Sequence, residues 1–484
     1  MRIILLALLL VNFSLFGQED ITELVHTSKN GSPIINGYAV KHSEEKGLCI
    51  FIHDSQTIAG NAFDEDFIYL GRLDSKPITR TQEYISGKSF DDSYSVFIKD
   101  DEKPNLQVLT YDFENQVVSE TELAINVSKK DILMSFDHKG LFYLLCIDKI
   151  KDELSIYNVD KYYEVSEKRF DLEKFDFFDA GDKARSLTNL LHFYKDEITK
   201  IYAKSIQEEF PISLPESTNK IKLYQDGSKI YITLDVSNNR TQLVQLDFLS
   251  DEVSINNYVQ ASGNKEHKIQ ASNSFIFEQY LLQIVAYKKD FSIAVKELSN
   301  KEKIASYTWD GSDAIAFTNT GTLKLKPSKN KRKEVSGKKF NSGLRKKPLG
   351  IYAYRKFENL QISFGFWDKA ITLEEQKTRN VLMTSMAVPF GASGVLFAFV
   401  VSPKGSVRSY GLHHNGTTTR AIGVFDAEFK HLPNVGVMPT VFHKIDRYVN
   451  RHEGTLPMLL FKYEDYFIYG SFYPEQNALK LLKF

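Results

Sequence analysis

The sequence predicts an all-β protein and, more narrowly, a β-propeller of seven blades, with eight blades as the alternative. Three observations support this. Short apolar strands alternate with polar turns along most of the 484 residues. Consecutive copies of one strand–turn–strand–turn–strand pattern begin about 40 to 50 residues apart, the period of a propeller blade. Aromatic residues make up 13% of the chain, mostly Phe and Tyr, which favour strands.

The repeated pattern is clearest in SYSVFIKDDEKPNLQVLTYD, which begins at Ser93. A small twisted sheet of this kind cannot bury both faces alone, whereas stacking such sheets around an axis buries them. Further copies begin at Gly47, Gly140, Ser228, Glu278, Gly394 and Thr455.

A weaker copy begins near Asn189, and its structure is ambiguous. Leu187, Leu190, Leu191 and Tyr194 have the spacing of a helical stripe. We favour strand here because the neighbouring copies set that register, and helix is the alternative. A short helix is expected over residues 372–379, where Thr372 and Glu375 have capping-box spacing.

The N-terminus MRIILLALLLVNFSLFGQED has the layout of a secretory signal peptide, with Arg2 before an apolar run and Gly17 before polar residues. The alternative, a membrane anchor, needs about 20 apolar residues, which this run does not reach. The segment resembles export signals of Gram-negative bacteria. We therefore expect a signal peptide at 1–17, a single propeller domain at 18–484 without a transmembrane segment, and a periplasmic or extracellular location.

Residues 324–347 are strongly basic in a chain that is otherwise acidic. They hold eleven Lys or Arg against Glu334, while the rest carries 50 basic and 61 acidic residues. Few apolar residues are present, so we expect a mobile loop at 327–347, inserted in a blade between a hairpin at 314–326 and strands at 349–367. It is either a solvated loop or a docking arm for an anionic surface or polymer, with candidate contacts at Lys331, Arg332, Lys333, Lys338 and Lys339. Nucleic acid is not expected for an exported protein, and Phe340 is the only aromatic residue among these charges that could stack on a base.

The common catalytic motifs are missing from the sequence. It contains no GxxxxGK[ST], GxSxG or HExxH pattern. Residues 235–241 mimic a calcium loop, but Arg240 occupies the position that requires Gly. Asp176, Asp179 and Asp182 fit a solvated turn better than a metal site. We therefore predict no metal and no cofactor.

Histidine is concentrated near the C-terminus, where five of eleven His lie in the last 72 residues. Loops at one end of a propeller channel commonly bind ligands, so the sequence offers a candidate binding region there. The alternative is ordinary hydrogen bonding. If 413–414 lay in a strand, the two side chains would point to opposite faces and could not share one ion. The candidate residues are Arg408, His413, His414, His443, Arg447 and His452.

The sequence favours a non-catalytic exported propeller that binds a protein, a glycan or an envelope component. The alternative is a propeller-fold carbohydrate-active enzyme, either a polysaccharide lyase or a glycoside hydrolase. A glycoside hydrolase needs two carboxylates about 5 to 9 Å apart, and no spacing in the sequence selects such a pair. The architecture resembles exported bacterial β-propellers of unassigned function, a resemblance that implies no functional residue.

Cys49 and Cys146 are expected to be free and buried rather than disulfide-bonded. Each lies in an apolar strand of its copy, and the copy that begins near Ser93 separates them. A disulfide needs Cα atoms within about 7 Å, which an intervening sheet prevents.

The signal-peptide prediction has a direct test. Because the apolar run ends at Phe16 and Gly17, the mature chain should begin at or near Gln18. Mass spectrometry of the exported protein should find this N-terminus, and an intact Met1 would contradict the prediction.

Overall fold

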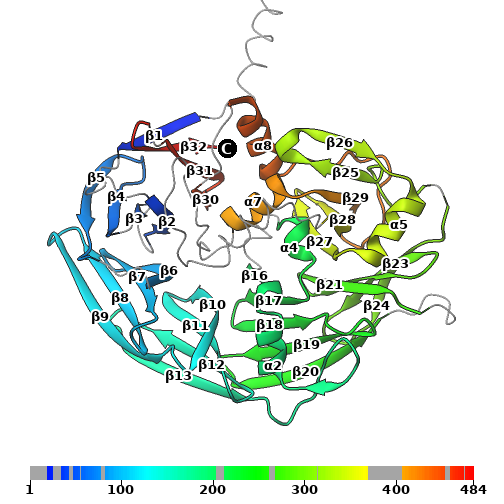
Figure 1. Ribbon diagram of the computed structural model, residues 1–484, viewed down its shortest axis with the longest axis horizontal. Coiled ribbons are helices and arrows are strands. Elements are labelled where there is room, and N and C mark those ends of the chain that lie inside the picture. Colours follow the sequence, from blue (N-terminus) through cyan, green and yellow to red (C-terminus); the bar gives the residue numbers. More distant parts are fainter. Residues whose placement is uncertain are drawn as a thin grey trace, which may run out of the picture.

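The four- and five-stranded sheets of the computed structural model are arranged in a ring (Figure 1), which confirms the all-β propeller. The structure describes residues 19–25, 34–42, 47–54, 56–77, 82–202, 212–260, 268–312, 314–368, 406–452, 458–473 and 475–484. Within these ranges seven such sheets are present, in agreement with the expected blade count. The helix expected over 372–379 lies outside the described residues.

Blades 1 to 3 are antiparallel four-stranded meanders. In each blade the strands follow one another in chain order, with the first strand toward the middle of the ring (Figure 1). Blade 1 holds β2 (Ile34–Lys41), β3 (Leu48–Asp54), β4 (Ile58–Phe63) and β5 (Tyr69–Asp74). Blade 2 holds β6 (Gln82–Phe90), β7 (Ser93–Asp100), β8 (Asn105–Asp112) and β9 (Val117–Asn126). Blade 3 holds β10 (Lys130–His138), β11 (Leu141–Asp148), β12 (Glu153–Val159) and β13 (Val165–Asp171).

Blade 4 differs because a parallel strand is added at its inner edge. The ambiguous segment before it is part helix and part strand, so the prediction of strand throughout is wrong. Ser186 caps the helix by accepting a bond from the Asn189 amide. The segment comprises β14 (Phe177–Phe178), β15 (Ala184–Arg185), α2 (Leu187–Phe193), η3 (Lys195–Glu197), the added strand β16 (Ile198–Tyr202) and α4 (Leu214–Ser217). The blade continues with β17 (Ile221–Asp226), β18 (Lys229–Leu234), β19 (Arg240–Asp247) and β20 (Glu252–Val259).

Blades 5 and 6 lie on either side of the basic segment. Blade 5 holds β21 (Ala271–Phe277), β22 (Tyr280–Ala286), β23 (Phe291–Glu297) and β24 (Lys303–Trp309). Blade 6 has the strand order β26-β25-β29-β28-β27, so its outer strands come from the chain that precedes its inner ones. Its elements are β25 (Leu323–Lys326), η4 (Pro327–Lys329), β26 (Lys331–Glu334), α5 (Gly337–Lys346), β27 (Leu349–Lys356), β28 (Asn359–Trp367) and β29 (Thr418–Phe425).

Blade 7 closes the ring with strands from both ends of the chain. It combines β30 (Leu459–Tyr463), β31 (Tyr466–Tyr473) and β32 (Ala478–Lys483) with β1 (Glu19–Val25), and two helices, α7 (Ser406–Asn415) and α8 (Val441–His452), precede it. The β1 strand pairs antiparallel with β32, from Glu19 opposite Lys483 to Val25 opposite Ala478.

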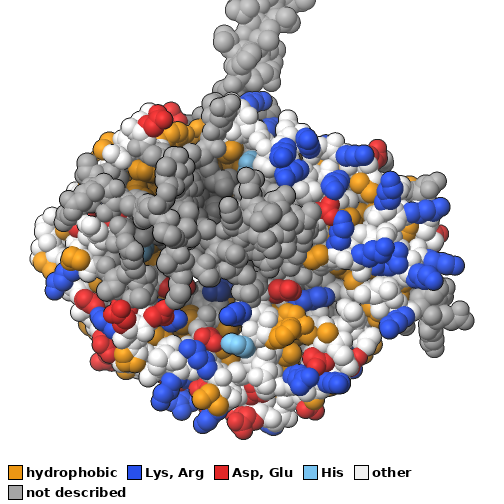
Figure 2. Space-filling view, viewed as in Figure 1, with side chains coloured by type: hydrophobic (Ala, Val, Ile, Leu, Met, Phe, Trp, Pro, Cys, Tyr) orange, Lys and Arg blue, Asp and Glu red, His pale blue; other side chains and the backbone are white. Residues whose placement is uncertain are grey.

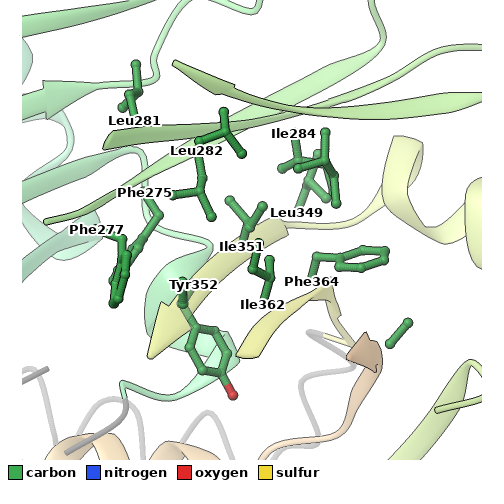
Figure 3. Close-up of a cluster of buried hydrophobic side chains, with 14 of the residues drawn as sticks. Phe275, Phe277, Leu281, Leu282, Ile284, Leu349, Ile351, Tyr352, Ile362 and Phe364 are labelled. Atoms are coloured by element: carbon green, nitrogen blue, oxygen red, sulfur yellow. The ribbon is translucent and has the colours of Figure 1, made fainter. Parts of the chain in front are cut away.

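Apolar clusters between the blades form the core. Figure 3 shows one of them between blades 5 and 6, where Ile284 of β22 lies near Ile351 of β27 and Phe364 of β28. All three side chains are fully buried. Successive side chains of a strand point to opposite faces of the sheet, so a strand with consecutive apolar residues gives its blade two apolar faces. Each blade therefore packs against two neighbours.

A buried polar network joins blades 4, 5 and 6. The ammonium of Lys222 donates to the Asp235 carboxylate at 3.1 Å, to Asn273 Oδ1 at 2.5 Å and to the Asn219 carbonyl at 2.8 Å. The Asn273 amide in turn donates to the Leu349 carbonyl of blade 6 at 2.7 Å. Such a buried ion pair is tolerated because every donor on the ammonium has an acceptor.

A mobile loop was expected at 327–347, but this basic segment has regular secondary structure. It forms η4, β26 and α5, and the expected hairpin at 314–326 is replaced by one between β25 and β26. Phe340 and Leu344, one helical turn apart, are fully buried between blades 5 and 6. The helix comes close to β28 because Gly343 has no side chain: a Cβ there would lie 2.1 Å from the Phe366 ring. Two apolar anchors at helical spacing thus attach α5 to the propeller, and the pairing of β26 with β25 holds the first half of the segment.

The cysteine prediction is confirmed. Cys49 of β3 and Cys146 of β11 are free and fully buried in blades 1 and 3, with blade 2 between them. Burial raises the pKa of the Cys146 thiol to about 12, so it remains protonated at neutral pH.

The burial of α5 leads to a stability prediction. Phe340→Ala should lower the free energy of unfolding by about 3 to 5 kcal/mol, because it opens a cavity between two blades. Chemical denaturation followed by tryptophan fluorescence would measure this. The exposed Lys338→Ala on the same helix is the matched control and should change stability by less than about 0.5 kcal/mol. Equal stability of the two variants would show that α5 does not anchor the blades.

Candidate functional site

The candidate histidine region is built on two helices rather than on strands. The copy predicted to begin at Gly394 was expected to continue as strands, but its described part begins with α7. Val407 and Tyr410 of α7 are buried against Phe442, Ile445 and Val449 of α8. Together they pack on blade 7, so one face of each helix is fixed by apolar contacts.

A single carboxylate, that of Asp446 on α8, is held by side chains from α7. The His413 ring contacts Asp446 through Nε2 at 2.9 Å, and the His414 ring contacts the other oxygen through Nδ1 at 2.7 Å. The Tyr410 hydroxyl donates to the same carboxylate at 3.1 Å. All four side chains are buried. Adjacent histidines reach one carboxylate because they lie on a helix, whereas on a strand they would diverge.

A second pair extends this histidine cluster. Arg420 of β29 contacts Nε2 of His443 at 2.9 Å, and the Thr440 hydroxyl contacts Nδ1 of the same ring at 2.9 Å. The rings of His413 and His443 lie 5.6 Å apart. We call Tyr410, His413, His414, Arg420, His443 and Asp446 the histidine cluster.

The pKa shifts follow from this packing. Burial lowers the pKa of His413, although its hydrogen bond with Asp446 acts in the opposite direction. Burial and then the Arg420 charge hold the pKa of His443 well below its usual value. Burial alone would raise the pKa of Asp446, but hydrogen bonds from His413 and His414 outweigh it and hold the pKa far below the usual range. The carboxylate is therefore ionised at neutral pH.

The predicted site residues do not form one site. His413, His414 and His443 come together, whereas Arg447, one helical turn after His443, is exposed to solvent and forms no hydrogen bond to the other three that the structure describes. Arg408 and His452 belong to α7 and α8, but their side chains lie outside the described part of the chain. The sequence reasoning missed Asp446, Tyr410, Arg420 and Thr440. The only available signal was the helical spacing of Val407, Tyr410 and His414.

The chemistry of the cluster is limited by its own contacts. Both oxygens of Asp446 already accept hydrogen bonds from the α7 side chains. Among the described residues, no group of three or more His, Cys, Asp and Glu is arranged to hold a metal ion. The cluster is therefore best understood as a set of buried hydrogen bonds that holds α7 and α8 together.

A second candidate site covers the outer side of blade 6 and α8. Figure 2 shows Lys and Arg side chains spread over the part of this view that α8, β25, β26 and α5 occupy in Figure 1. The helix α8 lies beside the β25–β26 hairpin, since the side-chain amide of Asn450 donates a hydrogen bond to the Pro327 carbonyl at 3.1 Å. We call the following exposed side chains of β26, α5 and α8 the basic face: Lys331, Arg332, Lys333, Lys338, Lys339, Lys346, Lys444, Arg447 and Arg451.

The basic face differs from the cations beside it in its contacts with the residues that the structure describes. None of its nine side chains forms an ion pair with another residue that the structure describes. Nearby Lys324 and Lys347 do have a partner, because both contact Asp368. All five lysines and arginines predicted in the basic segment belong to the face, and α8 adds three that sequence reasoning did not connect with them.

Comparisons with known proteins give little further information. No protein-family model matches the chain, and no curated protein matches it. Among solved structures, the WD40 domain of SCAP from fission yeast matches with 11% identity over 97% of this chain and 98% of that chain, with a TM-score of 0.36. Prolyl oligopeptidase B from Galerina marginata matches with 12% identity over 62% of this chain, with a TM-score of 0.29. The match spans 34% of that enzyme. We draw no functional conclusion from similarities this low.

The histidine cluster predicts how stability depends on pH. The folded state keeps His443 neutral, while the unfolded chain protonates it near its ordinary pKa of about 6.5. The unfolded state therefore binds more protons on acidification, and stability should fall as the pH drops from 7 to 5. Because the His443 ring stays neutral in the folded state over this range, the free energy of unfolding should fall by up to about 2 kcal/mol.

This dependence can be measured by urea unfolding at pH 7 and pH 5. His443→Gln should reduce the difference between the two pH values, whereas exposed His192→Gln, the matched control, should leave it as in the unmodified protein. A His443→Gln variant with the full pH dependence would show that His443 does not contribute to it.

Proposed function

We propose that this protein is an exported, non-catalytic β-propeller that binds an anionic partner through the basic face. The observation that carries the proposal is a fixed array of nine exposed cations on a chain whose remaining residues are acidic overall. An array of like charges costs stability through self-repulsion, and a bound anion reduces that cost.

The order of the basic segment supports this function. A mobile loop would lose backbone and side-chain entropy on binding, whereas residues whose backbone is already ordered on β26, α5 and α8 lose only side-chain entropy. Phe340 and Leu344 hold α5 in place, and the cluster around Asp446 holds α8. The binding surface is therefore largely preformed.

The histidine cluster gives no comparable support for the alternative, a carbohydrate-active enzyme. A glycoside hydrolase needs one carboxylate as acid and a second as base or nucleophile. Asp446 is the carboxylate of the cluster, and its oxygens are occupied by His413, His414 and Tyr410. For these reasons we favour binding over catalysis.

The position of β1 is compatible with export. Cleavage after Gly17 would leave the whole of β1, which begins at Glu19 and closes the ring against β32. A mature chain of residues 18–484 would thus keep every strand that the structure describes. No helix among the described residues is long and apolar enough to cross a membrane.

Binding of the mature chain to an immobilised polyanion, such as heparin, would test the proposed function. The protein should bind at 50 mM salt and weaken strongly at 300 mM, because exposed charges are screened. The triple variant Lys331→Gln, Lys333→Gln and Lys339→Gln should bind at least tenfold more weakly.

A matched control removes the same net charge elsewhere. Lys149, Lys161 and Lys168 each pair with an acid, at Asp131, Asp91 and Asp251. Changing these three lysines to Gln should leave binding within about twofold of the unmodified protein. The proposal fails if both triple variants weaken equally, or if the unmodified protein binds neither heparin nor the acidic vesicles described below.

A further inference from the structure

We infer that the anionic partner of the basic face is a lipid bilayer surface rich in acidic headgroups. This inference rests on the proposed function and specifies the chemistry of its partner. It depends on two properties of the face. The cations are spread over separate elements that are anchored to the propeller, and the structure describes no large exposed apolar side chain among them.

The arrangement is a broad set of cations on separate elements rather than a pocket. On α5, Lys338, Lys339 and Lys346 lie on the side opposite the buried Phe340 and Leu344. On α8, Lys444, Arg447 and Arg451 lie opposite the buried Ile445 and Val449. Each helix thus has an apolar side toward the propeller and a basic side toward solvent. The outer strand β26 adds Lys331 and Lys333 on one side and Arg332 on the other, all three exposed.

The face carries charge without exposed apolar side chains. None of the large hydrophobic residues that the structure shows as exposed lies on β26, α5 or α8. Sugar rings and bases are commonly recognised by stacking on aromatic side chains, and no such platform exists among the described residues of the face. Recognition must therefore be mainly electrostatic.

A fluid bilayer suits an array of this kind better than a polymer does. Acidic lipids diffuse laterally, so a headgroup can move to each ammonium or guanidinium without matching a fixed spacing. The charges of a polymer are spaced along its own backbone and cannot follow cations on three separate elements as easily. Each Lys or Arg near an acidic bilayer typically improves binding about fivefold.

Vesicle binding by the mature chain would test this inference. The protein should sediment with vesicles of 30% phosphatidylglycerol in phosphatidylcholine and not with phosphatidylcholine alone, and 300 mM salt should release it. The triple variant Lys331→Gln, Lys333→Gln and Lys339→Gln should bind roughly 100-fold more weakly, as the product of three fivefold losses. The control variant at Lys149, Lys161 and Lys168 should bind like the unmodified protein. Matching thermal unfolding curves would establish that both variants are folded.

The possible results separate this inference from the proposed function. If the protein binds heparin through the basic face but ignores the acidic vesicles, the bilayer inference is overturned and the proposed function stands. If it binds neither, both fail. If it binds acidic vesicles equally well with either triple variant, the basic face is not the contact surface and both fail.

Discussion

The antiparallel pairing of β1 with β32 is the contact on which the ring depends. It joins Val25 to Ala478, so the two ends of the described chain form one sheet. Each blade buries both faces only when it has two neighbours, and closure gives blades 1 and 7 their second neighbour. The cluster that includes Leu48, Ile52 and Leu481 lies at this junction. Without the pairing these side chains would be exposed, although every individual sheet could still form.

Much of the fold could be predicted because blade formation depends on short-range patterns. The copies at Ser93 and Gly140 correspond to β7–β9 and β11–β13, and the separation of Cys49 from Cys146 followed from the same register. The failures occurred where helices replace a predicted strand, as in α2 and α7, or a predicted loop, as in α5. Phe340 and Leu344 are only two apolar residues within a highly charged segment, so composition indicated a loop, while their spacing of four residues was the better signal.

The candidate site was harder to predict because its contacts join distant parts of the chain. His413 and Asp446 are 33 residues apart in sequence, and no local pattern links them. The basic face likewise joins distant parts of the chain, since α5 ends at Lys346 and α8 begins at Val441. The sequence predicted which residue types were unusual. Their grouping depended on the packing of α8 against blade 7 and η4, which only the folded chain reveals.

The histidine cluster and the basic face meet in α8, and each helps to explain the other. The outer side of this helix carries Lys444, Arg447 and Arg451, whose charges repel those of β26 and α5. On its inner side Asp446 is held by His413 and His414. A hydrogen bond to a charged group typically contributes about 1.5 to 3 kcal/mol, more than the roughly 0 to 1 kcal/mol of a pair of exposed charges. The histidine cluster therefore stabilises the position of α8, a cationic helix, beside the cations of β26 and α5 that repel it.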